Sequence, residues 1–268
     1  MCGQAKGSDK MKIISLVNQK GGVAKTTTAM ALADGFARRG KKVLLVDFDP
    51  QGHLTTSYGL EDENPDYPEA LRLLGLDKGI EVKETVLSHN LSIITSDIGL
   101  EEANTRLAPK YGRERFLDRA LRKYRDLYDY IIIDSNPSLS ITTINVIVAS
   151  DYILIPFKPE FNSFKGIDLL LDSVTEIQRD KPEIGVLGYI VTMADPRRRS
   201  TREAVEYVRS IAEERGGRVF HSEIRVGVAA ADAPSYGKSI LEYAPNSGVA
   251  ADYEHLCDEI LKTLEMEA

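Results

Sequence analysis

The sequence contains few cysteines, no tryptophan and no long hydrophobic run. Its 268 residues include two cysteines, Cys2 and Cys257, which lie at opposite ends of the chain without the spacing of metal ligands. A disulfide framework and a cysteine-based metal site are therefore not indicated, and Cys257 is expected in the core of a helix. No apolar run reaches about 18 residues, and the N-terminal segment lacks the apolar core of a signal peptide. We therefore expect a cytoplasmic protein without a membrane partner.

Positive charge is also scarce. The chain has 34 Lys and Arg residues against 41 Asp and Glu residues, a net charge of −7, which argues against nucleic acid as a partner of the average surface. Residues 195–225 are an exception, with eight arginines and six acids. Arg198, Arg202 and Arg209 have the spacing of one helical stripe. They can contact DNA phosphates, or they can pair with neighbouring glutamates on a solvated helix, and the sequence leaves both interpretations open.

Apolar strands alternate with amphipathic helices along the chain. This pattern predicts an α/β fold with a doubly wound, mostly parallel sheet covered on both faces. The expected strands are 12–18, 42–47, 91–95, 129–134, 151–157, 184–192 and 219–224. The expected helices are 25–39, 112–124, 140–149, 163–179, 200–214 and 248–265. We expect one domain over residues 12–268 after a flexible N-terminus, 1–11, with a mobile acidic loop at 61–68.

The stretch N-Q-K-G-G-V-A-K-T-T-T, residues 18–28, follows the first expected strand and leads into the first expected helix. A glycine loop in this context surrounds phosphate with backbone N–H groups and a helix N-terminus. Lys25 would then reach the β- and γ-phosphates of a nucleotide, and the Thr26 hydroxyl would ligate Mg²⁺. The alternative is a strand-to-helix turn whose glycines serve only steric needs, which the flanking lysine and threonines disfavour.

The loop departs from the usual pattern G-x-x-x-x-G-K-[ST]. Gln19 stands at the first glycine position and Ala24 at the second, while Gly21 and Gly22 have shifted inward. The loop can still form a tight turn lined with amides, but Ala24 must tolerate the backbone angles of its position.

Carboxylates stand at the ends of two further expected strands. V-D-F-D-P-Q-G places Asp47 at a strand end and Asp49 two residues later, and Y-I-I-I-D places Asp134 at another strand end. Because Mg²⁺ prefers oxygen ligands, these acids are candidates to organise a metal beside the loop. Each of them can alternatively cap the turn that follows its strand.

The motifs K-G-G-V-A-K-T-T, V-D-F-D-P-Q-G and I-I-D-S-N-P-S together resemble the ParA family of partition ATPases, in the wider group with a deviant Walker A loop. The similarity extends from about residue 12 to residue 265 and includes A-D-A-P-S-Y-G-K-S-I. It implies a P-loop ATPase with ATP and Mg²⁺ as cofactors. Three departures from the family are Ala24 in place of the usual glycine, Asn136 in place of proline, and Asp232 in place of glutamate.

The resemblance also implies roles for single residues. Lys20 would cross the interface of a nucleotide-sandwich homodimer to the phosphates held by the other subunit, and Asp49 would orient the attacking water. Asp47 and Asp134 would lie near the metal with Thr26. Nucleotide contacts would come from the loop and from two later residues: Lys20, Gly21, Gly22, Val23, Ala24, Lys25, Thr26, Thr27, Met193 and Pro234.

Within this group, DNA segregation is the favoured function. Iron proteins need cysteines that are missing here, and the acidic C-terminal stretch would be repelled by anionic lipid. The segment before the loop is too short for a helix-turn-helix domain, so we expect a nucleoid-associated ATPase that binds DNA without sequence specificity and is stimulated by a ParB-like or other partner protein. The alternatives are a positioning ATPase that acts on a protein cargo, and an ATP-dependent small-molecule ligase.

Overall fold

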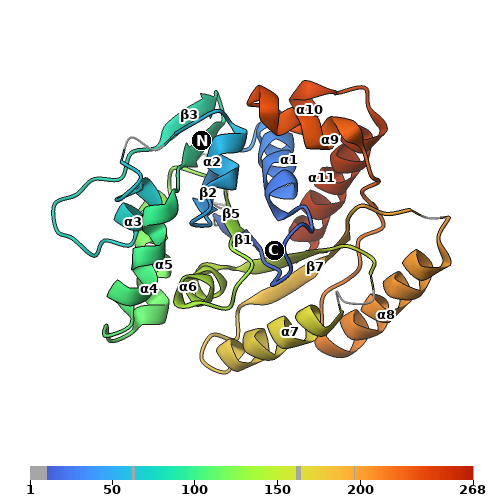
Figure 1. Cartoon of the computed structure of the whole chain (residues 1–268). Coiled ribbons are helices and arrows are strands. Elements are labelled where there is room, and N and C mark those ends of the chain that lie inside the picture. The colour runs from blue at the N-terminus through green and yellow to red at the C-terminus, as the bar shows by residue number, and fades with distance from the viewer. Residues whose placement is uncertain (1–10, 62–63, 161–163, 196, 268) are drawn as a thin grey trace, which may run out of the picture.

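The computed structural model describes residues 11–61, 64–160, 164–195 and 197–267. Its sheet has the strand order β3-β4-β2-β5-β1-β6-β7 (Figure 1). The strands are β1 Lys12–Leu16, β2 Val43–Phe48, β3 Thr85–Ser88, β4 Leu91–Ile94, β5 Tyr130–Ser135, β6 Tyr152–Phe157 and β7 Gly185–Val191. Every neighbouring pair is parallel except β3 and β4. The predicted doubly wound, mostly parallel α/β fold in a single domain is therefore confirmed.

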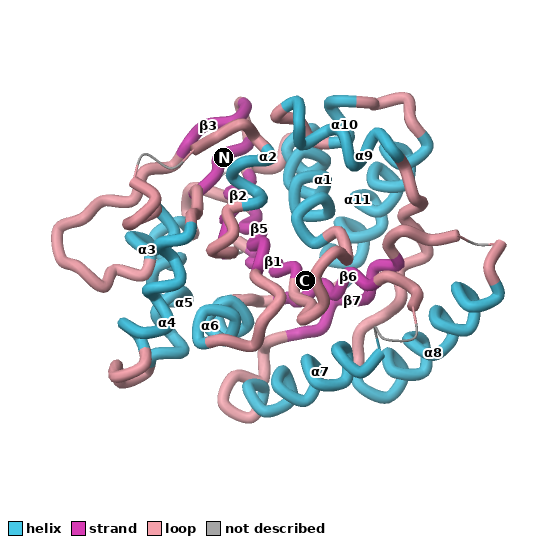
Figure 2. The backbone as a smooth tube through the Cα atoms, viewed as in Figure 1, coloured by secondary structure: helices cyan, strands magenta, loops and turns pink. Residues whose placement is uncertain are grey.

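Helices cover both faces of this sheet, as Figures 1 and 2 show. On one face lie α1 Lys25–Arg38, α10 Ile240–Tyr243 and α11 Gly248–Met266. On the other lie α3 Glu69–Leu73, α4 Glu102–Leu107, α5 Phe116–Leu121, α6 Ile141–Ala149, α7 Phe164–Gln178 and α8 Arg199–Arg215. Two further short helices are α2 His53–Ser57 and α9 Val228–Asp232.

The two faces of the sheet carry separate cores because successive strand side chains point to opposite sides. In β2, Leu44 packs into the core beneath α3 to α8, whereas Leu45 packs into the core beneath α1 and α11. α1 and α11 approach closely, since a methyl group on Gly35 would lie 2.4 Å from Cys257 Sγ. Cys257 is fully buried there, as the sequence predicted.

The predicted strand 219–224 is wrong. The segment runs beside β7 and donates from Phe220 N to Tyr189 O at 3.0 Å, but the amides of His221 and Ser222 donate to the Glu259 carboxylate of α11 at 2.8 and 3.0 Å. A side chain therefore takes the amides that a regular strand would use for pairing, and only isolated bridges remain.

The predicted helix 112–124 is shorter than expected for a related reason. α5 is flanked by 3₁₀ turns at Arg113–Arg115 and Arg122–Tyr124. The Asn145 side chain of α6 accepts from Leu117 N at 3.2 Å and donates to Arg113 O at 2.7 Å. These two backbone groups would form an i to i+4 bond in a continuous helix, so Asn145 substitutes for that bond.

Other predictions fall partly outside the described residues. Of the predicted flexible segment 1–11, only Met11 is described. Residues 62–63 of the predicted acidic loop 61–68 lie outside the described residues. Strand β3 and helices α2, α3, α4, α9 and α10 were not predicted, because each is five residues or so in length and carries too little periodicity. In the part of the chain that is described, no helix is long and apolar enough to cross a membrane.

Candidate functional site

The candidate site lies at the carboxyl ends of three neighbouring strands. β5 lies between β1 and β2 in the sheet. Asp134 is in register with Leu16 of β1 and with Asp47 of β2. The loop between β1 and α1 begins at the same edge, so the structure brings together the glycine loop and the acids that are widely separated in the sequence. Ligands of open α/β sheets bind at such strand ends.

The loop enters α1 through an unusual backbone conformation. Ala24 is the N-cap residue of α1 with φ 61° and ψ 32°, in the left-handed region, and its side chain provides no cap. Gly22 also has a positive φ, of 68°. Glycine adopts this region freely but alanine does not, so Ala24 is strained where the family usually has glycine. The uncapped amides at the start of α1 are the groups that can bind an anion.

Lys25 lies in the centre of the loop. Its Nζ donates to Asn18 O at 3.1 Å and to Lys20 O at 3.3 Å, and the residue is 8% exposed. Burial lowers the pKa of Lys25, while the charges of Asp134 and Asp49 act in the opposite direction. A cation is thus held inside the loop by backbone carbonyls and two nearby carboxylates.

Thr26 and Asp134 form the part of the site that could hold a metal. Thr26 Oγ1 donates to Asp134 Oδ2 at 2.6 Å. Asp134 Oδ1 is buried and has no hydrogen-bond partner among the residues that the structure describes. Burial, followed by the charge of Asp47, raises the pKa of Asp134 to about 8. Buried polar atoms are normally partnered, so an Mg²⁺ ion or its water fits this oxygen.

Asp47 holds the neighbouring backbone in place. It accepts from Thr55 N and Thr55 Oγ1, both at 2.8 Å, and from Asp49 N at 3.1 Å. Burial nevertheless raises its pKa to about 7. Asp49 is itself 8% exposed and accepts from Gln51 N at 3.0 Å. Asp47 therefore fixes the start of α2 and the position of Asp49, and Thr55 is a site residue that the sequence reasoning missed.

The rim of the site is formed by Lys20, Lys158 and Glu160. Lys20 Nζ lies 2.8 Å from Glu160 Oε2, and Lys158 Nζ lies 2.5 Å from Glu160 Oε1. The two lysines, Lys158 first, lower the pKa of Glu160 to about 2. Glu160 and Lys158 had no role predicted, although they stand in the stretch I-P-F-K-P-E. Lys20 thus extends to the surface, whereas Lys25 is buried.

Comparisons with known proteins agree with this geometry. An AAA domain family model matches residues 11–186. The sporulation initiation inhibitor protein Soj of Bacillus subtilis is 37% identical over 93% of this chain and 98% of that protein. The chromosome-partitioning ATPase Soj of Treponema pallidum is also 37% identical, over 93% of this chain and 97% of that protein. The chain belongs to the Soj/ParA family of partition ATPases.

Solved structures with the same fold have more varied functions. The cobyrinic acid a,c-diamide synthase of Mycobacterium smegmatis with ADP and magnesium has a TM-score of 0.81 at 27% identity and covers 96% of this chain and 97% of its own. An McdA–ATP complex from Cyanothece has a TM-score of 0.82 at 25% identity and covers 95% of this chain and 96% of its own. The fold alone therefore does not separate the Soj/ParA function from the alternatives.

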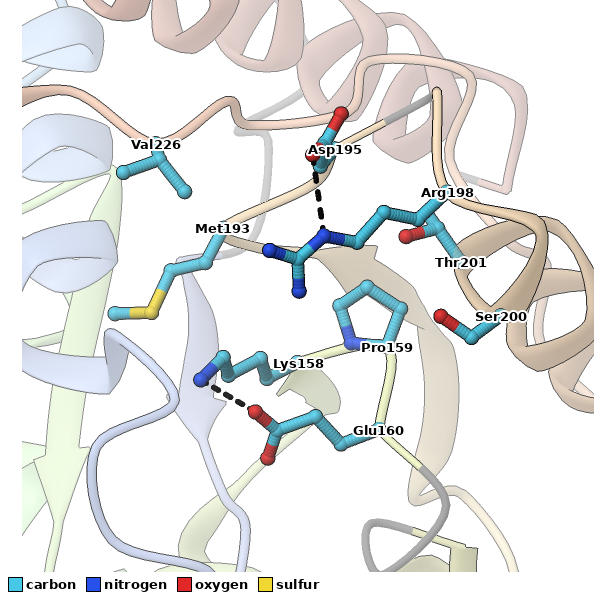
Figure 3. A pocket seen from close by; sticks show the side chains of 9 residues that line it. All are labelled: Lys158, Pro159, Glu160, Met193, Asp195, Arg198, Ser200, Thr201 and Val226. Atoms are coloured by element: carbon cyan, nitrogen blue, oxygen red, sulfur yellow. Dashed lines mark ion pairs between the residues drawn. The ribbon is translucent and has the colours of Figure 1, made fainter.

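A cavity of about 460 Å³ lies beside the rim. Figure 3 shows the side chains that line it, including Met193, Arg198 and Val226. Met193 has a positive φ of 52°, a conformation that is uncommon for a residue other than glycine. Pro234 lies in a 3₁₀ turn, Ala233–Tyr236, and is not among the described residues that line this cavity. Of the two residues expected beside adenine, Met193 lines this cavity and Pro234 does not.

The three arginines expected to bind DNA do not form one helical stripe. Arg198 precedes α8 as its N-cap residue and pairs with Asp195 at 3.2 Å, lining the cavity. Arg202 and Arg209 are both exposed on α8, and Arg209 pairs with Glu206. The expected stripe is therefore wrong at Arg198, because this residue precedes α8, which begins at Arg199.

Proposed function

We propose that this Soj/ParA-family chain is a DNA-segregation ATPase. ATP and Mg²⁺ bind at the strand-end site, ATP joins two copies of the chain into a homodimer, the dimer binds DNA without sequence specificity, and hydrolysis resets it. The observation that carries the proposal is the convergence of Lys25, Thr26 and the unpartnered oxygen of Asp134 at one edge of the sheet. Phosphate, a divalent cation and a nucleotide are what such a constellation binds.

Different residues of the site bind the phosphates and the metal ion. Lys25 and the amides of residues 21–27 bind the phosphates, and Thr26 with Asp134 holds Mg²⁺, directly or through its waters. The ion supplies neutralisation of phosphate charge. No cluster of three or more His, Cys, Asp or Glu side chains suited to a metal occurs in the described part of the chain.

Asp49 and Lys20 complete the catalytic proposal. Asp49 is held by the Gln51 amide beside the loop, where its carboxylate orients the attacking water. Lys20 lies at the surface, bound to Glu160, and reaches the phosphates held by the second subunit. A cation supplied in trans stabilises charge on the transferring phosphoryl group. The cavity beside Met193 accepts the adenine.

The partners follow from the same cycle. The ATP dimer binds non-specific duplex DNA, which places the protein on the nucleoid in the cytoplasm, and a ParB-like partner protein stimulates hydrolysis. The likeness to the synthase supports the alternative of a small-molecule ligase, but at 27% identity against the 37% of the Soj relatives. A positioning ATPase that acts on a protein cargo is the other alternative.

ATP turnover with and without non-specific duplex DNA, at constant Mg²⁺, tests this proposal. We expect slow turnover that requires Mg²⁺ and rises with DNA and a partner protein. Turnover that is indifferent to DNA, with no binding of duplex DNA at low salt, would favour the cargo-positioning alternative. Consumption of ATP only with an added carboxylic acid and an amide-nitrogen donor would favour the ligase.

A further inference from the structure

The most cationic stretch of the chain is distinct from the arginine segment 195–225. Residues 106–125 contain eight basic residues and two acids, a net charge of +6, against +2 for 195–225. The basic residues are Arg106, Lys110, Arg113, Arg115, Arg119, Arg122, Lys123 and Arg125. The stretch covers the end of α4, the following turn and α5. In Figure 1, α4 and α5 lie at the left of the molecule and α8 lies at the right.

The two cationic segments differ in how far their charges are paired. In 195–225, six of the eight arginines have a carboxylate partner. In 106–125, only Arg106, Arg115 and Arg122 have one. The other five cations form no ion pair with any residue in the described part of the chain. Their positive charge is therefore available to an anionic partner.

Backbone carbonyls hold two of these cations in place. Arg113 donates to Ala108 O at 2.8 Å, and Arg119 donates to Gly112 O at 3.0 Å and to Arg115 O at 3.1 Å. A neutral carbonyl orients a guanidinium without cancelling its charge. Both guanidiniums are thus fixed at the turn 108–113, which also carries Lys110.

An aromatic side chain stands at the same turn. Tyr111 has a relative exposure of 102%, and it lies between Lys110 and Arg113 in the sequence. Its ring is therefore uncovered, next to cations that the turn holds in place. In protein–DNA complexes, Arg, Lys and Tyr side chains are among those that hydrogen-bond to phosphate and sugar oxygens.

We propose that Lys110, Tyr111, Arg113 and Arg119, called here the α4–α5 turn, form a contact surface for the phosphate backbone of duplex DNA. The proposal rests on the proposed function, because it assigns where the dimer holds DNA. The α4–α5 turn contacts DNA either together with the arginines of α8 or in their place. Because the cations are exposed and unpaired, each phosphate contact releases a counterion and makes binding depend on salt.

Fluorescence anisotropy with a non-specific duplex, the full chain and ATP measures the effect at several salt concentrations. The variant Lys110→Ala/Arg113→Ala/Arg119→Ala is compared with Arg199→Ala/Arg202→Ala/Arg209→Ala, which loses the same charge from exposed positions on α8. We expect the α4–α5 turn variant to bind DNA more weakly than both the wild type and the α8 variant. The slope of log affinity against log salt concentration should become shallower by up to about 0.9 for each lost phosphate contact. Tyr111→Ala should weaken binding a few-fold with an unchanged slope, because no charge is lost.

A charge-preserving variant separates charge from folding. Arg113→Lys/Arg119→Lys loses the carbonyl-bound guanidiniums but keeps both charges, so it should bind DNA within about twofold of wild type if phosphate contact is the role. Basal ATP turnover of each variant checks that the site is intact. Wild-type affinity and slope in the α4–α5 turn variant, while the wild-type chain binds DNA, would overturn this inference and leave the proposed function standing. No DNA binding by the wild-type chain would overturn both.

Discussion

The interior and the rim of the strand-end site use charge in different ways. In the interior, Lys25 and Asp134 are 8% and 1% exposed, so solvent screens a charge on either group only weakly. At the rim, the side chains of Lys20 and Glu160 are 30% and 44% exposed, and solvent screens their ion pair. Interior substitutions should therefore act on nucleotide binding and stability, and rim substitutions on association between subunits.

Lys25→Ala should have the largest effect. The β- and γ-phosphates lose the only lysine buried in the loop, so ATP affinity should fall by about 100-fold or more. Isothermal titration with ATP and Mg²⁺ measures this. Lys78→Ala removes an exposed lysine outside the site and serves as the control. Wild-type affinity in Lys25→Ala would contradict the assignment of the loop.

Asp49→Ala should bind ATP but hydrolyse it slowly. Only the positioning of the water is lost, which we expect to lower turnover by about 100-fold. The protein should then accumulate as an ATP-bound dimer in light scattering. An unchanged turnover, or a monomer with ATP, would show that Asp49 does not have this role.

Lys20→Ala should separate the rim from the interior. The monomer should keep its ATP affinity within a few-fold, because Lys25 remains, but ATP-dependent dimerisation and stimulated turnover should be lost. Titration calorimetry and light scattering on the same sample measure the two properties. Lys158→Ala removes the other lysine on Glu160 and is the matched control. Normal ATP-dependent dimerisation of Lys20→Ala would contradict the proposal that Lys20 contacts the phosphates held by the second subunit.

Asp134→Asn should stabilise the nucleotide-free protein while it impairs turnover. The folded-state pKa of Asp134 is about 8 and that of an unfolded chain is about 3.9. The folded protein thus binds a proton that the unfolded chain releases, and stability falls as pH rises between these values. Removing the group should raise the free energy of unfolding by up to about 5 kcal/mol at about pH 8, reduced by any loss of the hydrogen bond with Thr26, and by less near pH 5.

Urea unfolding without ATP and Mg²⁺ at both pH values measures that gain. Asp126→Asn, at an exposed position, is the control and should change stability little. Equal destabilisation of Asp134→Asn at both pH values would mean that its hydrogen bond with Thr26 outweighs the burial of charge.

Ala24→Gly should have the smallest effect. It relieves the left-handed strain of Ala24 but adds entropy to the unfolded chain, so the net gain in stability should be about 0.5 kcal/mol. The same change at Ala33 inside α1 should instead lower stability by more than about 1 kcal/mol, because glycine weakens the helix and Ala33 is also buried. Thermal unfolding compares the two variants, and destabilisation by Ala24→Gly would show that the loop is not strained there.

The local pattern of the sequence was enough to predict the alternating strands and helices, the sheet type and the phosphate loop. Asp47 and Asp134 were singled out because buried parallel strands are continuous apolar runs, and polar residues at their ends stand out. Lys25 and Thr26 were singled out by the glycine loop between a strand and a helix. The resemblance added the roles of Lys20 and Asp49. These features depend on residues that are close together in the chain, or on the rule that parallel strands end at one edge.

The rest depended on side chains that meet only after folding. Asn145 shortens α5 and Glu259 takes the amides of the expected strand 219–224, and neither effect leaves a periodic signal. Glu160 meets Lys20 across 140 positions.

Three arginines of 195–225 pair with acids three or four positions away, Arg198, Arg199 and Arg209. The pairs of Arg215, Arg218 and Arg225 depended on tertiary structure, because their partners are distant in the chain. Sequence alone thus determined the elements and the pattern of the loop, whereas packing decided which charges are buried and which long-range pairs form, because both depend on distances between residues far apart in the chain.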